Sequence, residues 1–290
     1  MINMVKYAKY MKPLNVKAVR EMFELSRSEF YKAIPLLENG HPHPEVQSIL
    51  ENNNPGWVFS DRADIPEAAL VWSKGMKGHY LIGDETNEAF FSKLDEFVTT
   101  IIAPRMNELG INYFEVSGHN KKWDLNSLFA SRKLQQPWDQ IVYESSGFEA
   151  HTMNAPGNFR TVNLRSQEWK MFDYDNKGFV YDHINQFWET EEDFYEKGYG
   201  YAAIGNSEVV GVCYSSFVTK ERHAVGIETL PQLHQKGVGS NLASLVVNDI
   251  VQNGYTCYWD CSRSNEASNK IALRLGFKQI HQYQCSGFSL

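Results

Sequence analysis

Apolar residues follow helical spacing in some segments of the first half of the chain and strand-like spacing in others. Helical spacing covers residues 15–38 and 89–109, and Gly110 follows the second segment as a helix stop signal. Short apolar runs between and after these segments predict strands. The predicted strands are Trp57–Phe59, Ala68–Trp72, His79–Ile82 and Ile111–Val116. We therefore expect several strands, then a long helix, then another strand.

The second half of the chain repeats this order. The turn residues Gly205-Asn206-Ser207 separate two apolar runs and predict a β-hairpin. Gly254 and Gly276 lie where two later helices should end. The predicted strands are 159–164, 199–204, 209–218, 223–230, 255–261 and 277–285, and the predicted helices are 239–253 and 266–275, with mixed helix and loop at 166–196.

Asn, Pro and Gly cluster at residues 151–158, which predicts a boundary between two domains. We expect an N-terminal domain at 1–152 and a C-terminal domain at 158–290. A length of 290 residues fits two domains of moderate size.

Charge and composition exclude several classes of function. The 28 Lys and Arg residues are outnumbered by 35 Asp and Glu, so the net charge is −7 and a dedicated nucleic-acid binder is not expected. No apolar run approaches the ~20 residues of a membrane span, and the N-terminus lacks the apolar core of a secretory signal. Four cysteines do not make a disulfide scaffold. We expect a soluble cytoplasmic protein with no membrane and no nucleic-acid partner.

The cysteine and histidine positions do not predict a metal site. Cys257 and Cys261 lie on one predicted strand, hence about 13 Å apart, too far to share a zinc ion. We expect them to be buried thiols. His41 and His43 flank prolines in an extended loop, where surface histidines are more common than ligands.

A glycine loop between a strand and a helix carries the strongest chemical signal. The predicted strand at 223–230 leads into His234–Gly239, and the helix at 239–253 follows at once. Gly237 and Gly239 leave the backbone open, and the first helical turn offers unpaired N–H groups, so the loop suits a phosphate or diphosphate. A Walker loop is excluded because Lys236 precedes the glycines. The alternative is a corner whose glycines serve only packing.

Together with a second motif, this loop resembles the GNAT superfamily of acetyl-CoA-dependent N-acyltransferases. The family's Arg/Gln-x-x-Gly-x-Gly/Ala motif matches His234–Gly239, with His in the first place. Asn265–Phe277 resembles the family's Asn-x-x-Ala…Leu-Gly-Phe helix, and the resemblance covers residues 199–285. Gly226–Thr229 with Trp259–Ser262 is similar to the subgroup that includes the zwittermicin A resistance acetyltransferases. The resemblance implies an α/β fold of the GNAT type with a mixed sheet.

The first half looks like a second, degenerate copy of this fold, so that the chain would hold two tandem GNAT-like halves. Its element order matches, but Asp84-Glu85-Thr86-Asn87 stands where the glycine loop should be. Acidic residues there would repel a diphosphate. We predict no cofactor in the first half and expect it to cover the sheet edge and to wall the substrate cleft.

The family resemblance implies direct attack of a substrate amine on the thioester of acetyl-CoA. An alkyl ammonium has a pKa near 10, so a base must remove its proton at neutral pH, directly or through a water. Glu228, at the end of the strand that enters the loop, is the predicted catalytic base. The alternative for Glu228 is an exposed or salt-bridged strand-end carboxylate, and His223 and Glu221 are weaker candidates for the base.

The resemblance also implies which residues hold acetyl-CoA. Backbone groups after the strand would pair with the acetyl and pantetheine portions, and the loop amides would hold the diphosphate. Asn265 would bind the pantetheine arm, serve as a helix N-cap, or do both. The predicted cofactor-binding residues are Thr229, Leu230, His234, Gln235, Lys236, Gly237, Val238, Gly239, Ser240 and Asn265.

Two features leave the chemistry open. Many family members place a tyrosine as general acid where this chain has Ala272, so the thiolate leaves unaided or is protonated by Tyr283, Tyr258 or Cys285. The aromatic and acidic residues at 187–195 form either an amphipathic helix or the lining of a cleft for a cationic substrate.

The leading hypothesis is therefore an N-acetyltransferase that acts on a primary amine of a small molecule, with acetyl-CoA as co-substrate and no metal. The subgroup resemblance suggests an aminopolyol or an antibiotic as acceptor. The alternative is a catalytically silent acyl-CoA-binding regulator. Transfer from aminoacyl-tRNA is a third hypothesis, against which the acidic charge argues. The sequence predicts no oligomeric state.

Overall fold

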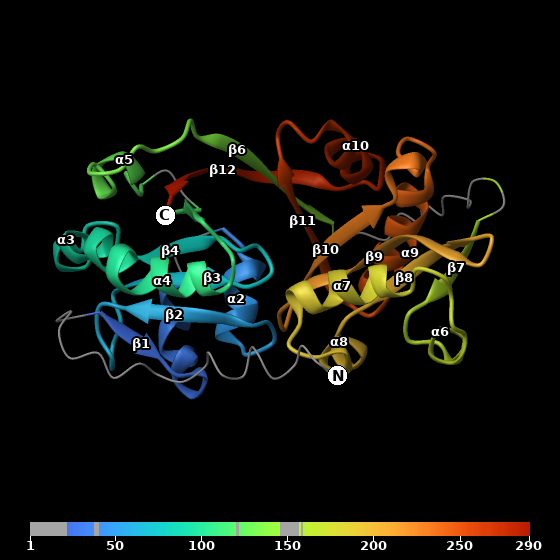
Figure 1. The fold of residues 1–290 in the computed structure, drawn as a ribbon, viewed down its shortest axis with the longest axis horizontal. Helices are drawn as coiled ribbons and strands as arrows, with labels where there is room; N and C mark the ends of the chain where they lie inside the picture. Colours follow the sequence, from blue (N-terminus) through green and yellow to red (C-terminus); the bar gives the residue numbers. More distant parts are fainter. Residues whose placement is uncertain (1–21, 38–40, 120–121, 146–156, 158) are drawn as a thin grey trace.

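The strands of the protein form one continuous sheet with helices on both faces (Figure 1). The structure, a computed structural model, describes residues 22–37, 41–119, 122–145, 157 and 159–290. Within these residues the sheet has twelve strands in the order β1-β2-β3-β4-β5-β12-β6-β11-β10-β9-β8-β7. Neighbouring strands are antiparallel except for two pairs, β4 with β5 and β10 with β11.

Each half of the chain contributes strands followed by helices in a similar order. The elements of the first half are β1 (Phe23–Leu25), the 3-10 helix η1 (Arg27–Leu37), α2 (Pro44–Leu50), β2 (Gly56–Ser60), β3 (Ala68–Ser73), β4 (His79–Gly83), α3 (Glu88–Phe97), the π-helix η2 (Val98–Ile102), α4 (Ala103–Glu108), β5 (Tyr113–Ser117), α5 (Leu125–Leu128) and β6 (Trp138–Ser145). Those of the second half are β7 (Arg160–Asn163), α6 (Gln167–Met171), α7 (Gly178–Phe187), α8 (Glu191–Lys197), β8 (Gly200–Gly205), β9 (Glu208–Val218), β10 (Arg222–Thr229), the 3-10 helix η3 (Pro231–Leu233), α9 (Val238–Gln252), β11 (Thr256–Ser262), α10 (Glu266–Arg274) and β12 (Lys278–Ser289).

Most of the predicted elements are confirmed, and the helix predicted at 15–38 is wrong for its described residues. Phe23–Leu25 is a strand that pairs with β2, and Arg27–Leu37 is a 3-10 helix. Pro35 lies inside that helix and cannot donate a backbone hydrogen bond. The earlier residues of the predicted helix lie outside the described part of the chain. The long helix at 89–109 is confirmed, with a π-helical turn in its middle.

The two halves exchange their last strands. β6, from the first half, pairs antiparallel with β11 of the second half, and β12, from the second half, pairs antiparallel with β5 of the first. β6 and β12 also pair with each other, and Figure 1 shows them side by side between the two halves. The segment at 151–158 lies, apart from Gly157, outside the described residues, so the two-domain division stays a prediction. Whatever the boundary, each half completes its part of the sheet with a strand from the other.

Helices cover the sheet on both faces of each half. In the second half, α9 and α10 pack on one face around Leu242, Val246 and Trp259, while α6, α7 and α8 pack on the other around Trp169 and Trp188. In the first half, α3 and α4 cover one face, and η1 and α2 cover the other. Burying these large apolar side chains is the main driving force for this arrangement.

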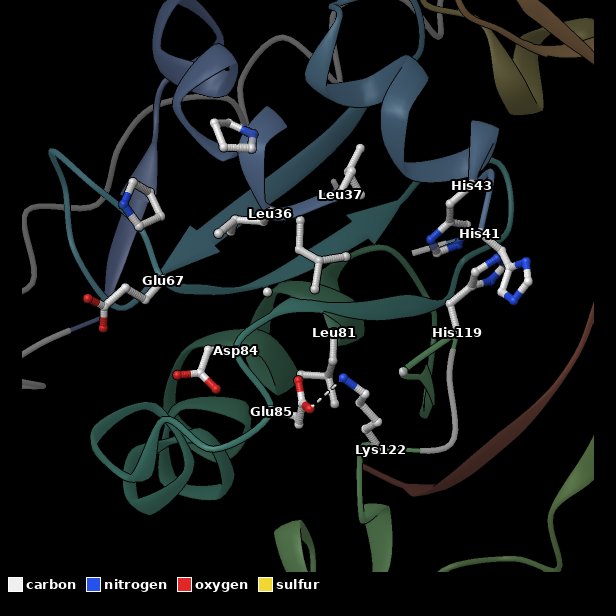
Figure 2. A pocket seen from close by; sticks show the side chains of 15 residues that line it. Leu36, Leu37, His41, His43, Glu67, Leu81, Asp84, Glu85, His119 and Lys122 are labelled. Carbon is white, nitrogen blue, oxygen red and sulfur yellow. Dashed lines mark ion pairs between the residues drawn. The ribbon is translucent and has the colours of Figure 1, made fainter. Parts of the chain in front are cut away.

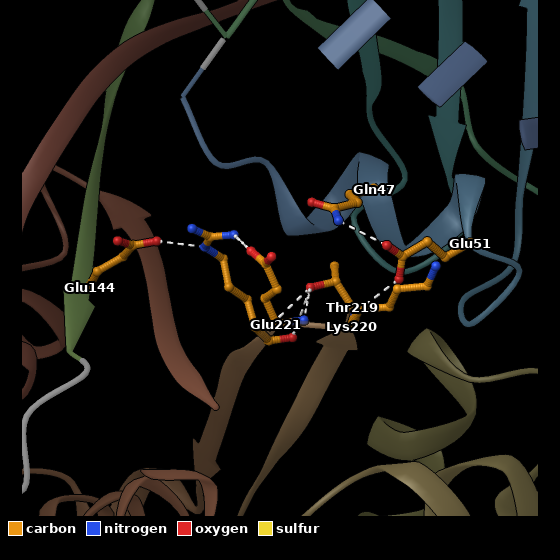
Figure 3. Close-up of polar contacts among 7 residues, drawn as sticks. Gln47, Glu51, Glu144, Thr219, Lys220 and Glu221 are labelled. Atoms are coloured by element: carbon orange, nitrogen blue, oxygen red, sulfur yellow. Dashed lines mark hydrogen bonds and ion pairs between the residues drawn. The ribbon is translucent and has the colours of Figure 1, made fainter. Parts of the chain in front are cut away.

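A polar junction joins the residues that follow α2 in the first half to α7, β9 and the turn after β9 in the second. The buried Asn54 side chain donates to the carbonyl oxygens of Phe187 (3.0 Å) and Ser216 (2.9 Å) and accepts from the amide of Val218 (3.3 Å). Figure 3 shows Glu51 accepting from the amide of Lys220 at 3.0 Å. Because these bonds satisfy backbone groups at the interface, they fix how the halves meet.

Candidate active site

The parallel strands β10 and β11 separate partway along their length. They pair only from Arg222 to Ala224 on β10, although β10 continues to Thr229. β11 keeps its pairing with β6 up to Ser262, and β10 keeps its pairing with β9 up to Thr229. The end of β10 therefore has one backbone edge without a neighbouring strand, and we call the space beside it the strand gap.

Alternate residues of β10 direct their backbone groups into the strand gap. The amide of Leu230 donates to the carbonyl of Val210 on the β9 side at 3.0 Å, and its carbonyl accepts from the amide of Leu233. Because alternate residues of a strand bond to opposite neighbours, the backbone groups of Ile227 and Thr229 face the gap. The amide of Thr229 thus has the orientation that its predicted cofactor contact needs, whereas the Thr229 carbonyl lies 3.3 Å from His234 Nε2 and both backbone groups of Leu230 have protein partners. Ile227 was not among the predicted cofactor-binding residues.

The loop after β10 turns the chain sharply into α9. Gln235 and Gly237 both have positive φ angles, 62° and 83°. Gly237 is the N-cap of α9, and its left-handed conformation favours glycine. The amides of Val238, Gly239 and Ser240 form the first helical turn and so lack an acceptor within the helix. These three N–H groups, with the positive end of the α9 dipole, make an anion-binding corner next to the strand gap.

Gly239 keeps this corner open toward the strand gap. A Cβ atom there would lie 3.1 Å from Ile227 Cδ1 and 3.8 Å from both Ile271 Cδ1 and Thr229 Cγ2. Its side chain would therefore project between β10, α9 and α10. Glycine at this position lets the first turn of α9 lie close to β10 and α10. The residues present fit the diphosphate and pantetheine of acetyl-CoA.

The polar side chains predicted to bind the cofactor around the loop lie in different environments. His234 Nε2 lies 3.3 Å from the carbonyl oxygen of Thr229, and Lys236 is exposed at the loop. Asn265 is the N-cap of α10 and accepts from the amide of Ser268 at 3.1 Å. The capping alternative for Asn265 is therefore confirmed, and its predicted contact with the cofactor stays a prediction.

The three candidate bases lie in different environments. Glu228 is exposed at the end of β10, on the face opposite α9. Glu221 is exposed and pairs with Arg222 at 2.9 Å (Figure 3). His223 is buried, its Nδ1 lies 3.0 Å from Ser215 Oγ, and burial lowers its pKa to about 4, helped by the charge of Arg165.

A group of ionisable side chains, most of them buried, lies on the face opposite α9. Tyr283 donates to Asp260 Oδ2 at 2.5 Å, and the Tyr258 ring is fully buried beside them. Glu45 of α2 is also buried, and burial together with the Asp260 charge raises the pKa of the Glu45 carboxyl. Burial likewise raises the pKa of Asp260, and Glu115 contributes, while the Tyr283 hydrogen bond acts in the opposite direction. We call Glu45, Tyr258, Asp260 and Tyr283 the junction cluster.

Two of the three alternative acids, Tyr258 and Tyr283, thus belong to the junction cluster, and Cys285 packs next to them. Ala272 is fully buried in the α9 core and touches none of this chemistry. Asp260 and Glu45 were not predicted as functional. Asp260 had one local signal, an acid in an otherwise apolar strand, and Glu45 had none.

The prediction that His43 is a surface residue is wrong. Its ring is buried and stacks on His119, with centroids 3.6 Å apart, and its Nε2 lies 3.9 Å from Glu45 Oε2. His41 is exposed and stacks on His281 at 3.8 Å. Burial lowers the pKa of His119 to about 3, and the nearby His281 adds to the effect. The stack therefore consists of uncharged rings at its buried end.

The cysteines are buried free thiols, as predicted for Cys257 and Cys261. Among the described residues, no group of three or more His, Cys, Asp or Glu side chains could hold a metal ion. The aromatic and acidic segment is not one helix: α7 ends at Phe187 and α8 begins at Glu191. Its Trp188 and Phe194 are buried in the core with α7 and α8 and do not line a cleft.

The first half has a pocket in the place that corresponds to the strand gap. β4 and β5 pair only at His79 and Tyr80, and a pocket of about 680 Å³ lies beyond that point. Figure 2 shows Asp84 and Glu85 at this pocket, with Lys122 paired to Glu85 at 3.1 Å. Hydrogen bonds from Thr86 lower the pKa of Asp84 and keep it ionised. This loop therefore places negative charge where the second half places free amides, and it does not fit a diphosphate.

The sequence is similar to known acetyltransferases. The sequence model described as "GNAT acetyltransferase" matches residues 35–286. A protein of Bacillus subtilis (strain 168) described as "Uncharacterized N-acetyltransferase YdfB" is 23% identical over 263 residues, which are 90% of this chain and 96% of that protein.

Solved structures with low sequence identity share the fold. A GCN5-related N-acetyltransferase-like protein from Streptococcus suis 89/1591 has a TM-score of 0.62 at 16% identity, over 89% of this chain and 98% of its own. A tandem GNAT protein from the clavulanic acid biosynthesis pathway has a TM-score of 0.61 at 8% identity, over 93% of this chain and 98% of its own. The predicted α/β fold with a mixed sheet and two similar halves is confirmed. No helix in the described residues is both long and apolar enough to cross a bilayer.

Proposed function

Because the chain belongs to the GNAT acetyltransferase family, we propose that it transfers an acetyl group from acetyl-CoA to a primary amine of a small molecule. The family supports acetyl transfer in general. The observation that supports the site is the position of the free amides of Val238, Gly239 and Ser240 at the mouth of the strand gap. A diphosphate held there would leave the rest of the cofactor next to an unpaired strand edge.

The residues of the second half then have separable tasks. Gln235, Gly237 and the first turn of α9 bind the diphosphate through N–H groups, and Lys236 adds positive charge. The backbone groups of Ile227 and the amide of Thr229, which face the strand gap, bind and orient the pantetheine and the acetyl carbonyl. His234 supports the loop through its contact with the Thr229 carbonyl. Asn265 caps α10, and its proposed contact with the pantetheine arm would be a second role.

The acceptor amine approaches from the opposite face of the sheet. Acetyl-CoA supplies the activated acetyl group, and the protein must remove a proton from the ammonium. Two carboxylates flank the strand gap on that face, Glu228 on β10 and Asp260 on β11. Glu228 is the base predicted from the sequence, and its exposed position gives it access to solvent and to an incoming cation. The subgroup resemblance supports an aminopolyol or an antibiotic as the acceptor.

The alternative function is a silent acyl-CoA-binding regulator. It is favoured by Ala272, which is buried in the core where many family members carry a catalytic tyrosine. Release of free CoA thiol, followed with a thiol reagent while acetyl-CoA is mixed with a panel of primary amines, distinguishes the two. Amine-dependent thiol release supports the transferase. Calorimetric binding of acetyl-CoA without release for any amine would favour the regulator.

A further inference from the structure

Asp260 lies at the point where the strand gap opens. The last pair between the two strands joins Ala224 to Tyr258, and Asp260 is two residues further along β11. Its neighbours Trp259 and Cys261 pack into the α9 core, so Asp260 projects to the opposite face, where the acceptor would enter. On β10 the residue two past Ala224 is Gly226, and the ring of Tyr214 from β9 lies over it.

The surroundings of Asp260 are those of a functional carboxylate. It is partly exposed, whereas Glu45 and Tyr258 behind it are buried. A hydrogen bond from Tyr258 lowers the pKa of the buried Glu45 carboxyl, against the larger opposing effects of burial and the Asp260 charge. The ionisable groups that face Asp260 are Tyr258 of the same strand, Glu45 of α2, Tyr80 of β4, Glu115 of β5, and Tyr283 and Cys285 of β12.

We propose that Asp260, rather than the exposed Glu228, accepts the proton of the acceptor ammonium, and that the acceptor is a cationic amine entering from the face opposite α9. This inference rests on the proposed acetyl transfer. Burial, with a contribution from the charge of Glu115, raises the pKa of Asp260 toward the working pH, which makes it a stronger base than an exposed carboxylate. Tyr283 positions the carboxylate through its short hydrogen bond.

The proton balance of the step is simple. The Asp260 carboxylate takes one proton from the ammonium, which frees the nitrogen lone pair. That pair forms the C–N bond to the acetyl carbon, and the C–S bond breaks as its electron pair returns to sulfur. The nitrogen loses a second proton to the thiolate, which leaves an amide and a free thiol. Asp260 then releases its proton to solvent.

The test compares Asp260→Asn with a matched variant, Asp249→Asn. Asp249 of α9 is also partly buried, its pKa is also raised by burial, and it also accepts from a tyrosine, Tyr201, at 2.9 Å. It lies away from the strand gap. Both variants retain an oxygen that can accept the tyrosine hydrogen bond, so both should fold. Melting temperature and acetyl-CoA affinity serve as checks on folding and on the loop.

The measurement is thiol release with 1,4-diaminobutane, glucosamine and an aminoglycoside between pH 6 and 10. At pH 7, Asp260→Asn should lower kcat about 100- to 1,000-fold, with acetyl-CoA affinity unchanged. The ratio of wild-type kcat to Asp260→Asn kcat should fall about tenfold for each pH unit, because the fraction of free amine rises with pH. A purely structural role of Asp260 would not produce this pH dependence. Asp249→Asn should stay within about threefold of the wild type.

Three results would overturn the inference. Normal turnover by Asp260→Asn refutes it alone and leaves the proposed acetyl transfer standing. If Glu228→Gln shows the pH-dependent loss of kcat and Asp260→Asn does not, Glu228 is the general base. A wild-type protein that binds acetyl-CoA and acetylates no amine refutes the proposed function and this inference with it.

Discussion

Placing a negative charge at Gly239 should weaken acetyl-CoA binding through electrostatics alone. The Cβ of a new side chain would point between Ile227, Thr229 and Ile271, into the space beside the free amides of α9. Gly239→Glu and Gly239→Gln introduce side chains of nearly equal size that differ by one charge. A carboxylate about 6 Å from a diphosphate with about two negative charges costs about 3 kcal/mol at an effective dielectric of about 40. That cost is roughly a hundredfold in Kd.

Isothermal titration calorimetry with acetyl-CoA measures this difference directly. Gly239→Ala is the control for shape, since its methyl group meets only the flexible end of Ile227 at 3.1 Å and should bind nearly as the wild type does. Raising the salt concentration should reduce the difference in Kd between the Glu and Gln variants, because mobile ions screen the repulsion between the carboxylate and the diphosphate. Equal Kd values for Glu and Gln would refute the placement of the diphosphate at this corner, provided that both variants melt at the same temperature.

Three further predictions concern stability. Lowering the pH from 7 to 5 should reduce the free energy of unfolding of the wild type by about 2 kcal/mol more than that of His223→Gln. The histidine gains a proton in the unfolded chain, whereas the buried ring, with its pKa of about 4, does not. Equal reductions for the two proteins in urea unfolding would contradict this. Asn54→Ala removes the hydrogen-bond partner of two carbonyl groups and one amide, and should lower the free energy of unfolding by about 3 kcal/mol. The control Asn126→Ala changes an exposed residue and should lower it by less than about 0.5 kcal/mol. Gly237→Ala forces an alanine to a φ of 83° and should cost about 1 kcal/mol in the same assay, with no comparable loss in Gly239→Ala.

The loop and the two helices of the second half could be predicted because their signals are local. Glycine at 237 and 239 and the Asn265 cap act on neighbouring residues, so the sequence around them determines the turn and the helix starts. The strand at Phe23–Leu25 has no such signal. This strand forms because β2, about thirty residues later, offers a free edge for pairing. In isolation, the apolar residues of Phe23–Leu25 would fit a helix equally well.

The exchanged strand and the junction cluster depend on contacts between distant segments. β6 was not predicted, since its polar residues Asp139, Gln140 and Glu144 interrupt the apolar pattern, and it is a strand because β11 and β12 pair with both of its edges. His43 and Glu45 are buried only because α2 packs onto the second half. No periodicity within either half could show that Glu45 and Asp260 would meet.

The central claim is that the amides at the start of α9 bind the diphosphate of acetyl-CoA beside the strand gap. A crystal structure of the acetyl-CoA complex tests it most directly. We expect diphosphate oxygens about 3 Å from the amide nitrogens of Gly237 to Ser240, with the pantetheine between β10 and β11. A diphosphate bound elsewhere, such as beside Asp84 and Lys122 in the first-half pocket, would contradict it.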